Sequence, residues 1–167
     1  ITWREAAGGM VLESSEATPA VGDTRESSDA IIERCVELLE AGGIVAIKGL
    51  GGFHLACDAA NEQAVVELRR HKRRSNKPLA VMVRGLADAE RLCHIDGVER
   101  DLLAGSVRPI VLLRRRAAGS NTHGSPDVPE LAPSVAHDLP ELGVMLPYTP
   151  LQHLLLAAAE THGMHAL

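Results

Sequence analysis

Residues Ile44–Asp58, IVAIKGLGGFHLACD, combine a buried strand, a glycine turn and a second extended segment. The run Ile44–Ile47 is wholly apolar and has the length of a buried strand. Lys48 follows it directly and precedes three glycines: Gly49, Gly51 and Gly52. Glycine lets the backbone take positive φ and lets a ligand approach the main chain closely. A lysine beside exposed N–H groups can bind an anion, but the same residues can also form a plain turn with a solvated lysine.

A basic cluster further along the chain favours the anion site. Six of the nine residues from Arg69 to Lys77 are Lys or Arg. Cations suit the C-terminal end of a helix, yet so many like charges in one place repel one another. Phosphate would relieve that repulsion, because arginine binds it through two parallel hydrogen bonds and lysine supplies a point charge. The two stretches together therefore predict a phosphate site.

The composition restricts the class of protein. The chain has 167 residues, of which 46% are hydrophobic, so it predicts one folded domain rather than a disordered segment. Its net charge of -5 and its single Trp, Tyr and Phe argue against a general nucleic-acid binder. Three widely spaced cysteines without a CxxC pair indicate a reduced, cytoplasmic protein. No apolar run has membrane-spanning length and no signal peptide is recognisable. The first residue is Ile1, so we expect a piece of a longer protein.

The order of apolar segments and caps predicts an α/β fold. Residues 1–28 are expected to be a loosely attached lead-in with one short strand at 10–12, and residues 29–167 to be the domain. Ser27, Ser28 or Asp29 is predicted to cap the first helix, Asn61 the second, and Thr149 a helix that begins at Pro150. Residues 117–142 are predicted to be a long surface segment, and residues 165–167 to begin a further strand. The remaining predicted elements are strands at 44–47, 79–83, 109–113 and 143–146, and helices at about 29–41, 62–70, 88–93, 98–104 and from 150 onward.

The sequence does not match the common motifs for nucleotide or metal binding. A dinucleotide fingerprint needs Gly or Ala where His54 stands, and no P-loop pattern is present. His162 and His165 are the only close histidine pair and have no further ligand beside them, so no metal site is predicted. Cys57 is interpreted as a small core residue. For His54, a place at the core edge and a ligand contact both stay open.

Several longer strings resemble a known family. They are Lys48–Asp58 (KGLGGFHLACD), Lys72–Met82 (KRRSNKPLAVM), Arg108–Leu113, Leu131–Pro133 and Leu142–Leu151 (LGVMLPYTPL). With these in view, the chain resembles the YrdC-like domains, and in particular those of the HypF-type carbamoyltransferases. The resemblance covers roughly residue 30 to the C-terminus.

The resemblance implies a YrdC-like twisted mixed sheet with flanking helices around a basic cavity. It also implies that the domain binds ATP and forms carbamoyl adenylate from carbamate, which neighbouring domains release from carbamoyl phosphate. The carbamoyl group would then pass to a HypE-type acceptor protein during [NiFe]-hydrogenase maturation, for synthesis of the cyanide ligand. An RNA-binding YrdC-like module without adenylation activity and a structural spacer are the alternatives.

The resemblance also suggests binding residues, although no catalytic residue is assigned. Lys72 and Arg74 match the KxR pair that holds the phosphates of the nucleotide. Lys48 and the turn glycines Gly49, Gly51 and Gly52 match the loop that faces the same cavity. Beside this match, His54 and Lys77 are also predicted to contact the nucleotide. Mg²⁺ is expected to accompany ATP, with Asp58 as the nearest carboxylate, although a cap is its more ordinary role. Zinc is expected only in a region upstream of Ile1.

One departure from the family concerns the end of the chain. The family continues into a Ser-x-Asn segment that helps to bind the nucleotide, whereas this sequence stops at Leu167. We therefore expect the domain to be incomplete at its C-terminus and to bind ATP weakly or not at all by itself. We also expect an unpaired sheet edge that favours self-association.

Overall fold

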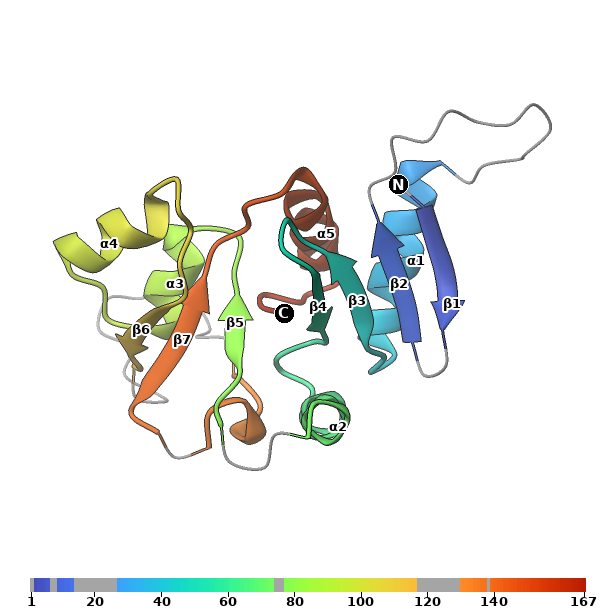
Figure 1. Cartoon of the computed structure of the whole chain (residues 1–167). Helices are drawn as coiled ribbons and strands as arrows, with labels where there is room; N and C mark the ends of the chain where they lie inside the picture. The colour runs from blue at the N-terminus through green and yellow to red at the C-terminus, as the bar shows by residue number, and fades with distance from the viewer. Residues whose placement is uncertain (1, 7–8, 14–26, 74–76, 117–129, 138) are drawn as a thin grey trace.

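The computed structural model describes residues 2–6, 9–13, 27–73, 77–116, 130–137 and 139–167. These residues form a mixed α/β structure in which two sheets lie beside each other, with helices packed around them (Figure 1). Within this part of the chain, no helix is both long enough and apolar enough to cross a lipid bilayer. The elements in chain order are β1 (Thr2–Ala6), β2 (Gly9–Glu13), α1 (Ser28–Glu40), β3 (Val45–Lys48), β4 (Phe53–Ala56), α2 (Glu62–His71), β5 (Ala80–Met82), α3 (Leu86–Leu92), α4 (Gly97–Ala104), β6 (Val111–Arg114), the 3₁₀ helix η1 (Pro133–Val135), β7 (Glu141–Met145) and α5 (Pro150–Thr161).

The first sheet has the order β1-β2-β3-β4. β1 and β2 are antiparallel, β2 and β3 are parallel, and β3 and β4 are antiparallel. The strand predicted at residues 10–12 lies within β2, and Met10–Leu12 pair with Val45–Ile47 of β3. β1 was not predicted, because a lone five-residue segment among polar residues shows no clear period. The lead-in therefore contributes two strands to the sheet.

The second sheet has the order β5-β7-β6, with β5 parallel and β6 antiparallel to β7. The central strand, β7, is apolar and buried from Leu142 to Met145. This is the pattern that a strand covered on both faces requires. In Figure 1 the edge of β5 that does not pair with β7 faces the first sheet across a gap, and the C-terminus of the chain lies in that gap.

Three helices begin where side-chain caps predict them. Ser27 caps α1, Asn61 caps α2 and Thr149 caps α5, and each side chain accepts a hydrogen bond from a backbone N–H in the first turn. α1 ends before Gly42, which has φ +82°, a conformation that glycine adopts without strain. The boundaries predicted for these helices agree with the structure within about two residues.

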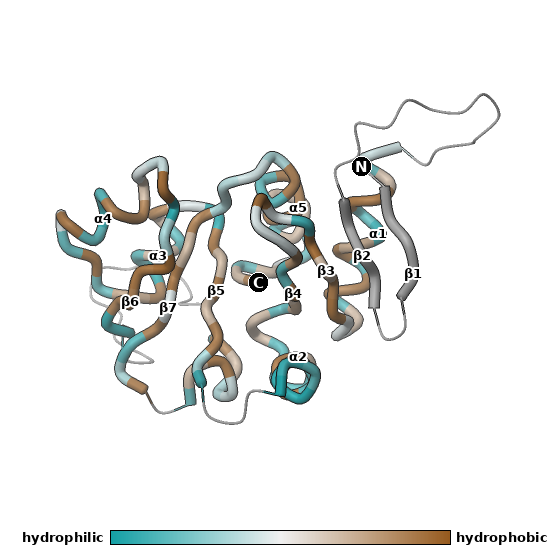
Figure 2. The backbone as a smooth tube through the Cα atoms, viewed as in Figure 1, coloured by the Kyte–Doolittle hydropathy of each residue, from teal (hydrophilic) through white to brown (hydrophobic). Residues whose placement is uncertain are grey.

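Two groups of buried side chains form the core. The first, which we call the α5 core, joins α1, β3 and α5 through residues such as Leu39, Ile47 and Leu155. The second, the α2 core, joins α2 to β5, β6 and β7 and to the segment around η1. Figure 2 shows hydrophobic residues along β3, β5 and β7 and mainly hydrophilic residues on α2.

The prediction of a surface segment at residues 117–142 was wrong for its later part. Leu131, Ala132, Val135 and Ala136 are all buried in the α2 core. They are held there by α2, because buried Arg69 donates a hydrogen bond from Nη1 to the Ser134 carbonyl oxygen at 3.1 Å. This burial could not be predicted from the sequence, because four apolar residues separated by Pro and Ser show neither the period of a strand nor that of a helix. Residues 117–129 and 138 lie outside the described part of the chain.

The last two residues pair with backbone on both sides of the gap between the sheets. Met82 N–H donates to the Leu167 carbonyl at 2.8 Å, and Leu167 N–H donates to the Met82 carbonyl at 3.1 Å. Such a reciprocal pair is the pattern of antiparallel strands. Ala59 N–H, just after β4, donates to the Ala166 carbonyl at 3.1 Å. Residues 166–167 therefore make the contacts expected of a starting strand, although no strand is assigned there.

His162, at the end of α5, links that helix to α1. Its Nδ1 lies 2.9 Å from Glu40 Oε2 and its Nε2 lies 2.8 Å from Glu33 Oε1. The hydrogen bond to Glu40, followed by that to Glu33, raises the pKa of His162 above its ordinary value of 6.5. The protonated ring donates to both carboxylates, so the folded protein binds this proton more tightly than the unfolded chain does.

We expect the contribution of His162 to stability to depend on pH. It should be fully present below about pH 6.5, the pKa of an unfolded histidine, and should be lost as pH rises through the raised pKa of the folded state. The melting temperatures of the unmodified chain and of His162→Gln should therefore differ most near pH 6 and converge by pH 9. The control is His153→Gln, on the exposed face of the same helix. A difference that does not change over this range would contradict the prediction.

Candidate functional site

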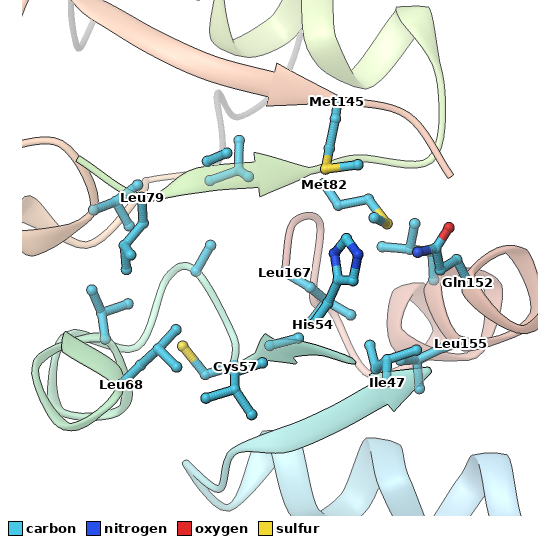
Figure 3. A pocket seen from close by; sticks show the side chains of 18 of the residues that line it. Ile47, His54, Cys57, Leu68, Leu79, Met82, Met145, Gln152, Leu155 and Leu167 are labelled. Atoms are coloured by element: carbon cyan, nitrogen blue, oxygen red, sulfur yellow. The ribbon is translucent and has the colours of Figure 1, made fainter. Parts of the chain in front are cut away.

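A cavity of about 310 Å³ lies between the two sheets and is closed at one end by α5. Its walls come from β3, β4, α2, β5 and α5, so it joins the α5 core to the α2 core (Figure 3). Most of the side chains that line it are apolar; those labelled in Figure 3 are Ile47, Cys57, Leu68, Leu79, Met82, Met145, Leu155 and Leu167. Lys72 is the only Lys or Arg among the described residues that line the cavity. Among the described residues, Lys72 therefore supplies the basic character that was expected of the cavity.

The turn between β3 and β4 lies beside this cavity and requires glycine at two positions. Gly49 N–H donates to the Gly52 carbonyl at 2.7 Å and closes the turn. Gly52 has φ +152°, which other residues rarely adopt. A Cβ on Gly49 would lie 2.6 Å from Tyr148 Oη and 3.0 Å from His54 Nε2. Gly51 has open space around it.

His54 and Tyr148 form a polar pair against this turn. Tyr148 Oη and His54 Nε2 are 2.8 Å apart, and the two rings are tilted at 58° with their centroids 5.9 Å apart. His54 lies on β4 and lines the cavity (Figure 3). Because imidazole and phenol can each donate or accept, this pair can offer either role to a ligand.

Gln152 lies in the first turn of α5. Its Oε1 accepts hydrogen bonds from Tyr148 N–H at 2.9 Å and from Thr149 N–H at 3.1 Å, which completes a capping box with Thr149. The side chain is 1% exposed and lines the cavity. Among the described residues, its Nε2 is the one buried side-chain nitrogen or oxygen that has no hydrogen-bond partner.

Of the residues predicted for the site, His54 and Lys72 line the cavity. Lys48 lies at the turn with its Nζ 4.7 Å from the centroid of the Phe53 ring, a cation–π distance. Lys72 caps the end of α2, and Lys77 is exposed. The prediction for Arg74 lies outside the described residues.

Sequence reasoning missed Tyr148 and Gln152. The pattern Thr149-Pro150-Leu151-Gln152 is a capping-box signature, and it could have placed the glutamine at the start of α5. It could not have shown that the other end of the amide enters a cavity formed by β3, β4 and β5, because those contacts are distant in sequence. Tyr148 meets His54 across 94 positions for the same reason.

Two other side chains have structural roles. Cys57 is buried, and this burial, more than the neighbouring charges, raises the pKa of its thiol to about 12, so its interpretation as a core residue is confirmed. Asp58 Oδ1 accepts the Ala60 N–H at 3.0 Å and holds a turn. No group of three His, Cys, Asp or Glu side chains suited to a metal ion occurs within the described ranges.

Comparison with known sequences identifies the family. Residues 37–164 match the Sua5/YciO/YrdC family, which carries the description "Telomere recombination". Carbamoyltransferase HypF2 of Cupriavidus necator is 50% identical over 147 residues, which are 87% of this chain and 17% of that protein. Threonylcarbamoyl-AMP synthase of Bos taurus is 34% identical over 122 residues, which are 71% of this chain and 43% of that protein.

A solved structure supports the same assignment. The crystal structure of full-length HypF in the phosphate- and nucleotide-bound form superposes with a TM-score of 0.68 at 42% identity, covering 80% of this chain and 16% of that one. The chain thus spans about a sixth of the length of the HypF proteins that it matches. The recognition of a YrdC-like domain of the HypF type and the expected α/β fold are confirmed. The chain belongs to the Sua5/YciO/YrdC family, and it is similar to one segment of the HypF carbamoyltransferases.

Proposed function

We propose that this chain is an ATP-dependent carbamoyl-adenylation domain of a HypF-type carbamoyltransferase. The observation that carries the proposal is the cavity lined by Lys72 and His54 beside the β3–β4 glycine turn. It agrees with the 42% identity to a HypF that is described as phosphate- and nucleotide-bound. In the whole protein, carbamoyl phosphate would supply carbamate, and a HypE-type protein would accept the carbamoyl group in cyanide-ligand synthesis for [NiFe]-hydrogenase. We place this reaction in the cytoplasm.

The proposed reaction joins carbamate to the α-phosphate of ATP. A carbamate oxygen attacks the α-phosphorus, the bond to the bridging oxygen of the β-phosphate breaks, and pyrophosphate leaves with the electron pair. Negative charge grows on the phosphoryl oxygens during this step. Fixed cations and backbone N–H groups stabilise such charge without a covalent protein intermediate. Lys72, Arg74 and Lys48 are the cations that we assign to this role.

The turn residues Gly49, Gly51 and Gly52 are proposed to bring backbone close to the ligand, with Lys77 as a further cation. Mg²⁺ would reach the site bound to the phosphates of ATP. Asp58 is not assigned to it, because this side chain holds a turn. The metal ion would shield the negative charge of the phosphates. We assign no residue of this chain as its ligand.

The test is carbamoyl-dependent exchange of labelled pyrophosphate into ATP. A suitable protein is a chimera in which this chain replaces the matching 147-residue segment of HypF2. We expect exchange that requires carbamoyl phosphate and is absent when the segment is deleted. A chimera that folds but shows no exchange would contradict the proposal. Salt-dependent binding of duplex RNA without nucleotide binding would instead support the RNA-binding alternative.

A further inference from the structure

Ser134, in the 3₁₀ helix η1, is held by two side chains of α2. The Glu62 carboxylate accepts two hydrogen bonds from it, one from the backbone N–H at 3.0 Å and one from Oγ at 2.5 Å. Buried Arg69 donates from Nη1 to the Ser134 carbonyl at 3.1 Å. The hydroxyl, the N–H and the carbonyl of one residue are therefore all bonded to α2. We call these three residues the Ser134 clamp.

The clamp restrains α2 in more than one direction. Glu62 and Arg69 are seven residues apart, which is close to two turns and about 10 Å along the helix axis. A single hydrogen bond would let the helix pivot, whereas two side chains that converge from separate turns oppose both sliding and rotation against η1. The hydrogen bonds from the Ser134 hydroxyl and then from its N–H lower the pKa of Glu62 below its ordinary value of 4.5, so the carboxylate stays ionised at neutral pH.

The residues on either side of Ser134 connect the clamp to both sheets. The carbonyl of buried Val135 accepts the N–H of Leu79, just before β5, at 2.8 Å. Ala132 N–H donates to the carbonyl of Ala59, just after β4, at 2.8 Å. η1 packs against α2, and both lie beside the start of β5 (Figure 1). The clamp therefore fixes α2 relative to the strands on both sides of the cavity.

Lys72 is the side chain whose position depends most on this arrangement. It follows Arg69 by three residues and caps the C-terminal end of α2. Arg69 itself belongs to the clamp, and Arg70 pairs with Glu67 on the helix surface. Arg73 has φ +50°, which costs energy for a residue other than glycine. The chain thus leaves the helix in a direction that its local preference does not favour, so contacts elsewhere must hold it there.

We propose that the Ser134 clamp positions Lys72 for the adenylation step, which makes Glu62 and Ser134 positioning residues of that reaction. They act through Lys72 and not by contact with the nucleotide, because they hold the helix that carries the ammonium group to the cavity wall. A displacement of about 1 Å in such a group can slow a reaction by as much as about 10²-fold. This inference rests on the proposed function.

The test measures carbamoyl-dependent pyrophosphate exchange in the chimera described above, with Glu62→Ala as the variant that opens the clamp. We expect exchange at least about tenfold slower than in the unmodified chimera. Glu62→Gln should stay within about threefold, because an amide can accept from the Ser134 N–H and donate to its Oγ. Both substitutions remove the same negative charge, so their difference separates positioning from a general electrostatic effect.

Asn61→Ala is the matched control for stability. Asn61 caps the same turn of α2 by accepting the Ala64 N–H at 3.1 Å, and it is not part of the clamp. Loss of such a cap destabilises a helix. We expect Asn61→Ala and Glu62→Ala both to lower the melting temperature, and only Glu62→Ala to slow exchange by about tenfold or more.

A double-mutant cycle with Lys72→Ala tests whether the clamp acts through this lysine. Once Lys72 is absent, adding Glu62→Ala should slow exchange by no more than about a further twofold. Losses that multiply in full would show that Glu62 acts independently of Lys72, which would overturn the proposal. If Glu62→Ala does not fold, Ser134→Ala, which removes only the hydroxyl, replaces it in the cycle.

The outcomes also separate this inference from the proposed function. Unchanged exchange in Glu62→Ala would overturn the role of the clamp and leave the proposed function intact. The same conclusion would follow if Glu62→Gln or Asn61→Ala slowed exchange as much as Glu62→Ala does. No exchange by the unmodified chimera would overturn both.

Discussion

Lys72→Ala is expected to lower carbamoyl-dependent pyrophosphate exchange by about 10²–10³-fold, the usual loss when one group that stabilises transition-state charge is removed. Lys72 lines the cavity and is the only Lys or Arg among the described residues that do so. Its charge would act on the phosphates of a bound nucleotide. Arg74→Ala is expected to have a similar effect if the two residues act as a pair.

The matched control for Lys72 is Arg70→Ala. Arg70 belongs to the same basic cluster, but its side chain is 71% exposed and pairs with Glu67 on the surface of α2. Both substitutions remove one positive charge, so a general electrostatic effect would lower exchange equally in both. Exchange that stays within a few-fold of the unmodified chimera in Lys72→Ala would exclude this lysine from the phosphate site.

Gly49→Ala should destabilise the fold by about 1–3 kcal/mol, the usual cost of overpacking. The new Cβ would lie 2.6 Å from Tyr148 Oη and 3.0 Å from His54 Nε2, so it would push apart the pair that joins β4 to the start of α5. The free energy of unfolding in urea measures the loss. We also expect the His54 ring signals to move in NMR spectra, because their hydrogen-bond partner is displaced.

The control for this substitution is Gly51→Ala in the same turn. A Cβ on Gly51 meets no atom within 4 Å, and its φ is not in the left-handed region. Gly51→Ala should therefore change stability little. Equal stability of the two variants would show that the turn moves enough to accommodate the methyl group, and that Gly49 is not required for packing.

Local signals in the sequence were sufficient for much of the fold. Ser27, Asn61 and Thr149 marked helix starts because a cap acts on N–H groups within its own first turn. The apolar runs that became β3 and β7 were also clear. β7 is buried from Leu142 to Met145, and a strand covered on both faces needs no alternation. These features depend on residues only a few positions apart.

The features of the fold that the sequence did not predict depend on contacts between residues far apart in the chain. The apolar residues of the segment Leu131–Ala136 are buried where Arg69 of α2 donates a hydrogen bond to the Ser134 carbonyl, 65 positions further along the chain. The pairing of β1 with β2 and the meeting of His54 with Tyr148 are likewise decided by the assembled fold. For the candidate site, the family resemblance named Lys72, and the sequence left His54 open between a core-edge place and a ligand contact. Both line the cavity, whereas the orientation of Gln152 needed coordinates.

The position of the cavity between the α5 core and the α2 core has a consequence for unfolding. Each core has its own set of buried contacts, so each is able to act as a separate cooperative unit in native-state hydrogen exchange. A molecule bound in the cavity touches Ile47 and Leu155 of one core and Leu68 and Val81 of the other. Either core would then lose ligand contacts on opening, and the ligand stabilises only the state in which both are closed. Amide protection in α1 and in β7 should therefore rise together when the cavity is filled, and the two halves should exchange as one unit.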